Sequence, residues 1–219
     1  MGGYRTFRAQ MTAPRDDKPR QRRSQNTRRR LKEHALRAFA DLGHDGVNLA
    51  RDILEPASVS TGSFYHQFSD KTELLAELIV EGAHRRREVI TGLITSPTVD
   101  SVNLDEAITV GFERLFASFD DPADGWMLVL NERRNGDRRI QQALASGREV
   151  WADELARFLS RWTEAELDAR RAVGQMLVAL SAGLATMYLG LPPDQRTRRR
   201  PDLVANAASF ALYGLGALD

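Results

Sequence analysis

Cysteine is absent from the sequence, and its absence excludes disulfide bonds and thiolate metal sites. The absence fits a reducing, intracellular compartment, so a cytoplasmic protein is expected. The first ten residues, MGGYRTFRAQ, lack the apolar segment of a secretory signal. We therefore interpret them as part of the mature chain or as a cloning remnant.

Recognisable catalytic motifs are also missing. The four histidines do not form HExxH or a comparable metal-ligand spacing. The sequence has no GxSxG motif, no phosphate-binding P-loop and no dinucleotide-binding fingerprint. It therefore predicts that the protein is not an enzyme and needs neither a metal nor another cofactor.

No segment shows the sustained alternation of apolar and polar residues that is typical of a β-strand. Apolar residues recur instead at helical spacing, and this pattern predicts an all-α fold with about nine helices and no internal repeat. A chain of 219 residues is long enough for one or two domains and buries roughly 70–75% of the surface of its unfolded state. A hydrophobic core can therefore stabilise it without cross-links.

The formal net charge of +1 conceals an uneven distribution of charge. Residues 1–30 contain ten Lys and Arg against Asp16 and Asp17, a net charge of +8, so the other 189 residues carry a net charge of −7. A basic arm on a mildly acidic body is expected where one end of a protein meets a polyanion such as DNA. A solvated, disordered tail is the alternative.

Local signals predict the first helices. Residues 1–23 are polar and without period, which predicts a flexible arm. Apolar residues at helical spacing predict a first helix from Thr27 to Gly43, and Asn48 can cap a short second helix.

Later helices are predicted from the same kinds of signal. Asp70 with Glu73 three residues later resembles a capping box, which opens a helix that reaches about residue 93. Further predicted helices open at Asn103, Pro122 and Thr163, and a long apolar face marks another helix over residues 140–162.

One stretch, EPASVSTGSFYHQFSDK at residues 55–71, interrupts this helical pattern. A helix-turn-helix needs a short helix, a tight turn and a second helix whose N-terminal half is exposed. Residues 48–55 can supply the short helix and residues 57–59 the turn. Ser60 is a good cap for the second helix.

Two phenylalanines can hold the second helix in place. Phe64 and Phe68 lie four residues apart and can pack against Phe39 and Ile53. The opposite side of the helix then carries small and hydrogen-bonding residues, which suit an approach to base edges and phosphates. An ordinary helical connection is the alternative, although it would gain nothing from exposed aromatic rings. The predicted DNA-binding residues are Asn48, Thr61, Gly62, Ser63, Tyr65, His66, Gln67 and Lys71.

Residues 27 to about 80 resemble the N-terminal DNA-binding domain of TetR-type transcriptional regulators. The resemblance rests on LARDI in the second helix, VSTGSFYHQF across the turn and recognition helix, and DKTELL at the start of the next helix. It implies a three-helix helix-turn-helix domain over residues 24–72 and a larger helical domain for effector binding and dimerisation over residues 73–219. With this neighbour, the basic arm is expected to add salt-sensitive, non-specific affinity for DNA.

The sequence departs from the family pattern at three positions. Ser58 stands where the family usually has glycine in the turn, so a left-handed backbone there would cost about 1 kcal/mol more, or the turn is built differently. Pro56 disfavours helical geometry at Glu55, which predicts an end or a kink of the second helix. Gln67 replaces the more usual His or Tyr, which bears on the operator sequence.

Two long segments near the C-terminus carry no charge. Residues 172–193 are uncharged over 22 positions and residues 203–218 over 16. The first is long enough for a membrane span, but a DNA-reading head needs access to a chromosome. Because a helix that is apolar all round must be buried on more than one side, we predict a two-fold homodimer in which the last two helices pair with their mates.

The resemblance also implies a mostly apolar effector pocket among the middle helices. Plain core packing is the alternative for each of the aromatic residues there. Asn131, Glu132 or Arg133 could supply a polar contact, or could form a solvated face. The predicted lining residues are Phe112, Phe116, Trp126, Trp151 and Met176.

The sequence therefore predicts a ligand-responsive DNA-binding transcriptional regulator, by resemblance a repressor. It is expected to bind a palindromic operator as a dimer and to be released by a small apolar or amphipathic effector. A ligand-independent, architectural DNA-binding dimer is the alternative, and that alternative predicts no enclosed cavity larger than a water molecule within residues 103–190.

Overall fold

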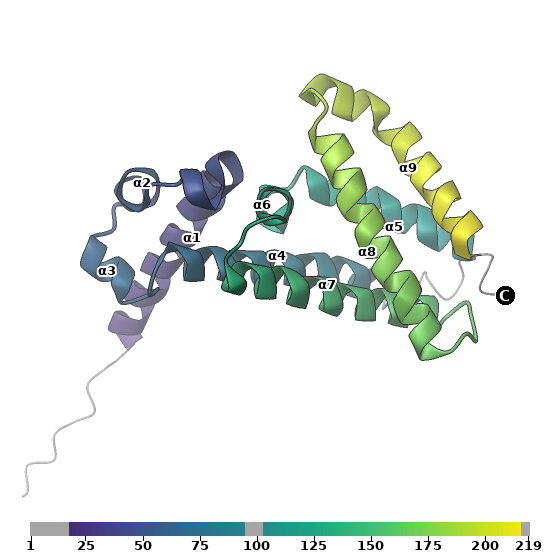
Figure 1. Ribbon diagram of the computed structural model, residues 1–219, viewed down its shortest axis with the longest axis horizontal. Coiled ribbons are helices and arrows are strands. Elements are labelled where there is room, and N and C mark those ends of the chain that lie inside the picture. Colours follow the sequence, from purple (N-terminus) through teal and green to yellow (C-terminus); the bar gives the residue numbers. More distant parts are fainter. Residues whose placement is uncertain (1–17, 95–102, 216–219) are drawn as a thin grey trace, which may run out of the picture.

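The computed structural model describes residues 18–94 and 103–215, and within these ranges the fold is all-α, with nine α-helices and no strand (Figure 1). The predicted arm falls largely outside them, because residues 1–17 are not described. The helices are α1 (Lys18–Gly46), α2 (Glu55–Ala57), α3 (Thr61–Tyr65), α4 (Lys71–Ile94), α5 (Leu104–Phe119), α6 (Trp126–Glu132), α7 (Arg138–Leu159), α8 (Leu167–Leu189) and α9 (Pro193–Leu215).

The helices form a head and a body (Figure 1). The head consists of α1, α2, α3 and the start of α4, and the body contains α5 to α9. The long helices α4 and α7 pack side by side and connect the two ends of the molecule. One hydrophobic cluster lies in the body, while the cluster of the head extends to Leu128 of α6 and to Ile140 and Leu144 of α7. One continuous hydrophobic cluster therefore joins the head to the body.

The first helix starts earlier than its apolar period predicts. It begins at Lys18 instead of Thr27, so part of the predicted arm is helical. Lys, Arg and Gln are good helix formers, but they carry no apolar period that would reveal a helix. Near its other end, Gly43 breaks the helix with φ 67° and ψ 171°, and one more turn follows to Gly46.

Most of the predicted helix caps are present. Asp70 accepts a hydrogen bond from the Glu73 amide at 2.8 Å, and Asn103 accepts one from the Glu106 amide at 2.9 Å. The predicted start at Thr163 is wrong, because α8 begins four residues later at Leu167. The Thr163 hydroxyl instead accepts the Ala165 amide at 3.1 Å within the loop before α8.

The turn after α2 contains a left-handed serine. Ser58 has φ 50° and ψ 49°, so the first of the two predicted possibilities is correct. Its amide donates to the Glu55 carbonyl at 2.9 Å, and its own carbonyl accepts from Arg30 Nη2 at 3.1 Å.

A glycine at this turn is expected to stabilise the protein. The Ser58→Gly variant should raise the free energy of unfolding by about 1 kcal/mol, because glycine has no Cβ to strain the left-handed backbone. For a chain of this size that corresponds to a rise in Tm of about 2–4 °C in thermal unfolding. A lower Tm would mean that the serine side chain contributes more than the backbone strain costs.

The α8 helix is long and apolar enough to cross a membrane by length and composition alone. Only 28% of its apolar window is buried inside the chain. Gly174, Val178 and Ser181 face the body, whereas Met176 and Met187 are exposed. One face of α8 therefore lacks a covering surface within the described chain.

Candidate DNA-binding interface

The short helix before the turn is built from two different windings. Leu49–Leu54 forms a π-helical turn that continues directly into α2, and the Asn48 side chain caps it by accepting the Arg51 amide at 3.1 Å. The chain remains helical through Pro56, so of the predicted end or kink at Glu55 the end does not occur, and the winding changes there from π to α.

The second helix of the motif, α3, is short and is held by buried aromatic rings. Ser60 caps it by accepting the Ser63 amide at 3.2 Å, as predicted. Phe64 and Phe68 are both buried, with their ring centroids 5.8 Å apart, and they share one hydrophobic cluster with Phe39 and Ile53. The predicted support of this helix is therefore confirmed.

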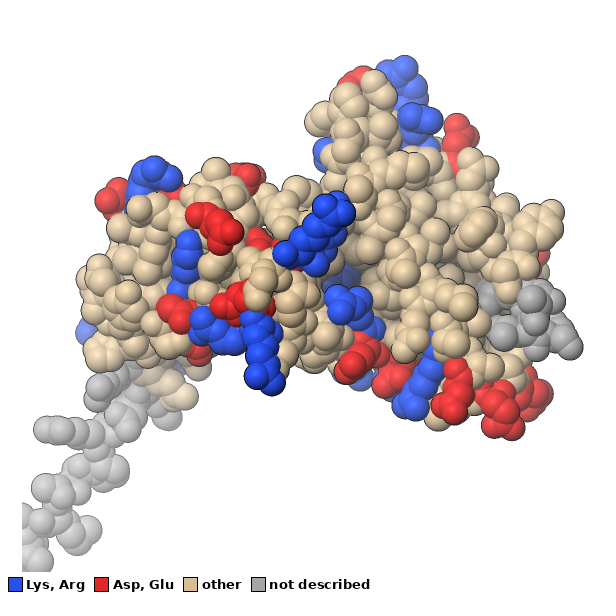
Figure 2. All heavy atoms as spheres, viewed as in Figure 1, with Lys and Arg blue, Asp and Glu red and all other residues tan. Residues whose placement is uncertain are grey.

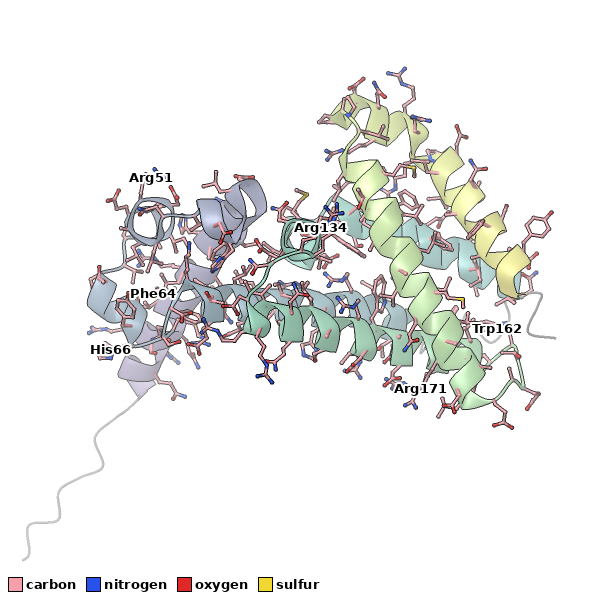
Figure 3. All side chains as sticks on the ribbon, in the orientation of Figure 1. Arg51, Phe64, His66, Arg134, Trp162 and Arg171 are labelled. Atoms are coloured by element: carbon pink, nitrogen blue, oxygen red, sulfur yellow. The ribbon has the colours of Figure 1, made fainter. Side chains whose placement is uncertain are left out.

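The opposite side of α3 faces outward at the outer end of the head, where Figure 3 labels Phe64 and His66. Thr61, Gly62 and His66 are exposed, and 57% of Tyr65 is exposed. Ser63 is half-buried, and its hydroxyl accepts from the Ser60 hydroxyl at 2.9 Å. This side combines small residues, hydroxyl groups and a helix N-terminus, which together can approach a phosphate or a base edge.

Two of the predicted contact residues are already engaged inside the protein. Gln67 lies after the end of α3, and its side-chain amide nitrogen, Nε2, donates to the Ser24 hydroxyl of α1 at 2.8 Å. Contact between this side chain and an adenine therefore requires that the bond to Ser24 is broken. Lys71 donates to the carbonyls of His44 and Val47 at 2.7 and 2.9 Å. These bonds tie the start of α4 to the last turn of α1 and to the loop after it, and they occupy two of the three protons of the ammonium group.

Two arginines of α1 position the motif, in addition to their contribution to the basic charge of residues 1–30. Arg30 donates to the carbonyls of Ala57 and Ser58 and so holds the turn. Arg28 lies 4.2 Å from the centroid of the Phe68 ring and donates to the Gln67 carbonyl at 2.8 Å. For Arg28 the available signal was its place three residues before the buried Leu31, because residues three or four apart share a helix face, whereas Arg30 directly precedes Leu31 and has no such signal.

Two of the cavities in the body include predicted lining residues. The larger has a volume of about 290 Å³ and includes Trp126 and Trp151 in its wall, and the smaller, about 60 Å³, includes Phe112 and Trp151. Phe116 is fully buried but lines neither cavity, because it packs against Phe119 and Tyr188 with centroids 5.1 and 5.3 Å away. The prediction for Met176 is wrong: 68% of it is exposed, because the register of α8 points it away from the body.

Arg86 of α4 is the buried cation beside these cavities. Only 7% of it is exposed, and its guanidinium carbon lies 4.8 Å from the centroid of the Trp126 ring. Burial lowers the pKa of Arg86 to about 10, although the nearby Asp124 raises it. The pKa of Asp124 is itself raised, first by burial and then by Asp121. Arg86 therefore stays charged at neutral pH inside an apolar region.

The α6 helix connects the body to the head. Asn131 donates to the carbonyls of Phe39 and Ala40 at 3.1 and 2.8 Å. Glu132 is buried and accepts the His44 amide at 2.6 Å. Both side chains therefore join the two parts of the molecule and do not line the larger cavity. Arg133 does line it, and lies 3.4 Å from the Thr186 hydroxyl.

A short exposed helix behind a tight turn, held on a buried aromatic support at the end of a helical body, defines a DNA-binding protein of the helix-turn-helix class. Residues 33–78 match the family model described as bacterial regulatory proteins, tetR family. These residues form the core of the head described above. The head therefore resembles the DNA-binding domain of TetR-type transcriptional regulators, in agreement with the resemblance seen in the sequence.

Curated relatives match a part of the chain of similar length. The chain is 36% identical over 66 residues to the HTH-type transcriptional repressor AcnR of Corynebacterium glutamicum, which covers 30% of this chain and 35% of that protein. It is 38% identical over 63 residues to AcnR of Corynebacterium diphtheriae, covering 29% of this chain and 33% of the relative. The chain thus matches about a third of the length of these relatives, and the match is to a DNA-binding repressor.

Solved structures extend the likeness to the whole fold. The protein superposes on Salmonella enterica GusR with a TM-score of 0.65 and 17% identity, covering 84% of this chain and 93% of that one. Reduced Escherichia coli NemR gives a TM-score of 0.66 at 19% identity, over 85% and 95% of the two chains. The fatty acid degradation regulator FadR from Bacillus halodurans gives 0.67 at 15% identity, over 86% and 96%. At these identities the likeness establishes the fold.

Proposed function

We propose that the protein is a cytoplasmic transcriptional repressor that binds a palindromic operator as a two-fold dimer and leaves it when a small molecule enters the body. The single observation that carries the proposal is the exposed side of α3 on its buried support, Phe64 and Phe68. A helix held in this way can enter a major groove without loss of packing.

The exposed residues of α3 supply the proposed direct contacts. Thr61, Gly62, Ser63, Tyr65 and His66 face the duplex in this proposal. The Asn48 side chain and Lys71 flank them, and Lys71 uses its remaining proton for a phosphate. Gln67 reads a base after exchanging its bond with Ser24 for one to the DNA.

Gly62 offers a direct test of close approach. A Cβ placed at Gly62 meets no atom within 4 Å, so Gly62→Ala should fold normally and gain about 0.5–1 kcal/mol of helix stability. In the complex, the added methyl group should meet DNA and weaken operator binding by about tenfold or more. Thermal unfolding and a DNA-binding titration measure the two effects, and a Gly62→Ala protein with unchanged operator affinity would place Gly62 outside the interface.

The uncovered faces of α8 and α9 support the proposed dimer. Figure 2 shows mainly uncharged residues over these helices, with charged residues at the edges. Met176 and Met187 of α8 and Phe210 and Tyr213 of α9 are all exposed, the last two by 67% and 88%. Pairing two copies through this face covers the apolar surface and places two recognition helices about 34 Å apart, as one turn of DNA requires.

The connection between body and head supports a response to a ligand. The α4 helix carries Lys71 in the head and Arg86 beside the cavities, while α6 contacts α1 through Asn131 and Glu132. A ligand that changes the packing of these helices favours a dimer whose recognition helices no longer match one face of DNA. Ligand and operator then weaken each other by the same factor, a coupling of about 1–3 kcal/mol.

Selection of bound sequences from random duplex DNA with the purified protein tests the proposal. The expected product is a palindromic consensus with half-sites one helical turn apart. A protein indifferent to nucleotide order would overturn it. The cavity of about 290 Å³ is partly open to solvent, so a ligand can enter it, and this supports the responsive regulator over the ligand-independent alternative.

A further inference from the structure

Two cavities of the body share one boundary. Among the residues that the structure describes, Arg86 of α4 and Trp151 of α7 alone belong to both walls. The larger cavity, about 290 Å³, lies among α4, α6, α7 and α8, and the smaller, about 60 Å³, among α4, α5, α7 and α8. A group placed at this boundary therefore contacts the same two side chains from either cavity.

The two shared side chains have hydrogen-bond donors without partners. Arg86 donates from Nη1 to the Asp124 carbonyl, but its Nε makes no hydrogen bond within the described residues. The Trp151 Nε1 is likewise buried and without an acceptor in the described part of the chain. Such buried, unsatisfied donors are rare in proteins and cost about 1–3 kcal/mol each.

The charges around the cavities have one sign. Arg114 lines the smaller cavity, Arg133 and Arg148 line the larger one, and no acidic side chain lines either wall among the described residues. Asp124 is the carboxylate whose charge raises the pKa of Arg86. Its side chain makes no ion pair with Arg86 in the part of the chain that the structure describes, because Arg86 bonds to the Asp124 backbone carbonyl instead. A buried cation normally has a charged partner.

A neighbouring buried charge shows the usual arrangement. Glu154 of α7 is 3% exposed and accepts hydrogen bonds from Arg87 at 3.0 Å, from Thr91 at 2.9 Å and from Arg157. Its charge is therefore compensated within the protein. Arg86, one residue before Arg87 on the same helix, lies beside a cavity and has no comparable partner.

We propose that the effector is an amphipathic anion, with an acidic head group bound by Arg86 and an apolar body in the larger cavity. This inference rests on the proposed regulatory function and specifies the chemical class of its ligand. A carboxylate fits the planar fork of a guanidinium and accepts two parallel hydrogen bonds. Trp126, Leu130 and Val178 contact the apolar body, and the Trp151 N–H gains an acceptor after a small shift of its side chain.

The volume of the larger cavity determines which small molecules are suitable test ligands. A volume of about 290 Å³ lies at the small end of ligand pockets, which span roughly 300–1,000 Å³. Decanoate and phenylbutyrate are therefore suitable acids. Decanol and phenylbutanol have the same apolar bodies with a neutral head, and decylamine has a positive head.

The experiment is a titration of the full-length protein with each probe, followed by tryptophan fluorescence and by thermal unfolding. Trp126 and Trp151 flank Arg86, so binding changes their emission. At least one acid should bind about tenfold or more tightly than its alcohol, because it gains charge-assisted hydrogen bonds. Decylamine should bind more weakly than either compound with the same chain.

Three variants locate the head group. Arg86→Met should remove the preference for the acid and leave the affinity for the alcohol within about threefold. Arg86→Lys keeps the positive charge but loses the two parallel donors of the guanidinium, so it should retain a smaller preference for the acid over the alcohol. This variant keeps the test valid if Arg86→Met fails to fold. Arg134→Met removes the same charge from an exposed position that lines neither cavity and should change the preference little.

Equal affinity for acid and alcohol, binding by no acid of the set, or an unchanged preference in the folded Arg86 variants would each overturn the inference. Operator binding is measured in parallel. Sequence-specific DNA binding without acid binding would refute the anion site and leave the DNA-binding function intact. Arg86-dependent acid binding that leaves operator affinity unchanged would support the site and refute the proposed release by ligand.

Discussion

Replacing Phe64 by alanine is expected to lower the free energy of unfolding by about 3–5 kcal/mol, whereas replacing its neighbour Tyr65 should change it by less than about 1 kcal/mol. Phe64 is fully buried in the core of the head, and truncation leaves a cavity there. Tyr65 is 57% exposed and touches Phe64 only through an edge contact with ring centroids 5.2 Å apart. Adjacent residues on one short helix therefore have opposite predicted roles.

Tyr65, which contributes little to stability, is expected to contribute directly to operator affinity. Tyr65→Ala should keep its fold and lose about 1–3 kcal/mol of operator binding, since its ring lies on the side proposed to face the duplex. Tyr65→Phe, which removes only the hydroxyl group, is the matched control and should lose less. Chemical denaturation and operator titrations give the two free energies. A Tyr65→Ala protein that binds its operator normally would contradict the proposed orientation of α3.

Phe210→Asp is expected to convert the dimer into monomers. Phe210 lies on the uncovered face of α9 with 67% of its surface exposed. Burying a phenylalanine contributes about 1.5–3 kcal/mol, and a two-fold interface contains two copies of each residue. Loss of both copies, together with two buried carboxylates, should raise the dimer dissociation constant by about a thousandfold or more.

Sedimentation at micromolar concentration measures this effect, and the operator affinity should fall with it because a monomer holds only one half-site. Leu42→Asp is the control. Leu42 is also an exposed apolar residue, 48% exposed, but it belongs to α1 in the head. If Phe210→Asp remained dimeric, or if both variants dissociated equally, the proposed interface through α8 and α9 would be wrong.

The two proposed sites lie on one continuous helix. Lys71 in the first turn of α4 binds the end of α1 and the loop after it, and Arg86 lies about four turns further along, beside the cavities. A helix is stiff over this distance because each turn is hydrogen-bonded to the next. Binding of an anion to Arg86 is therefore positioned to alter the packing of the head without a mobile linker.

Much of the DNA-binding head was predictable because its signals are local. The Ser60 and Asp70 caps, the pair Phe64 and Phe68 and the turn at Ser58 each depend on residues within a few positions of one another. The length of α1 was not predictable in the same way, since its charged first turns carry no apolar period. The start of α8 was misplaced because the hydroxyl of Thr163 caps a loop instead of a helix.

The sequence by itself determined the helical class, the motif, and the face of α3 that remains outside, because spacing and capping act within single helices. Only the tertiary structure decided that Met176 points away from the body, that Gln67 and Lys71 are held by α1 and the loop after it, and that the cation beside the cavities is Arg86. These outcomes depend on how helices distant in sequence pack together. An apolar period shows which residues share a face, but the neighbour that covers that face is chosen by packing over the whole molecule.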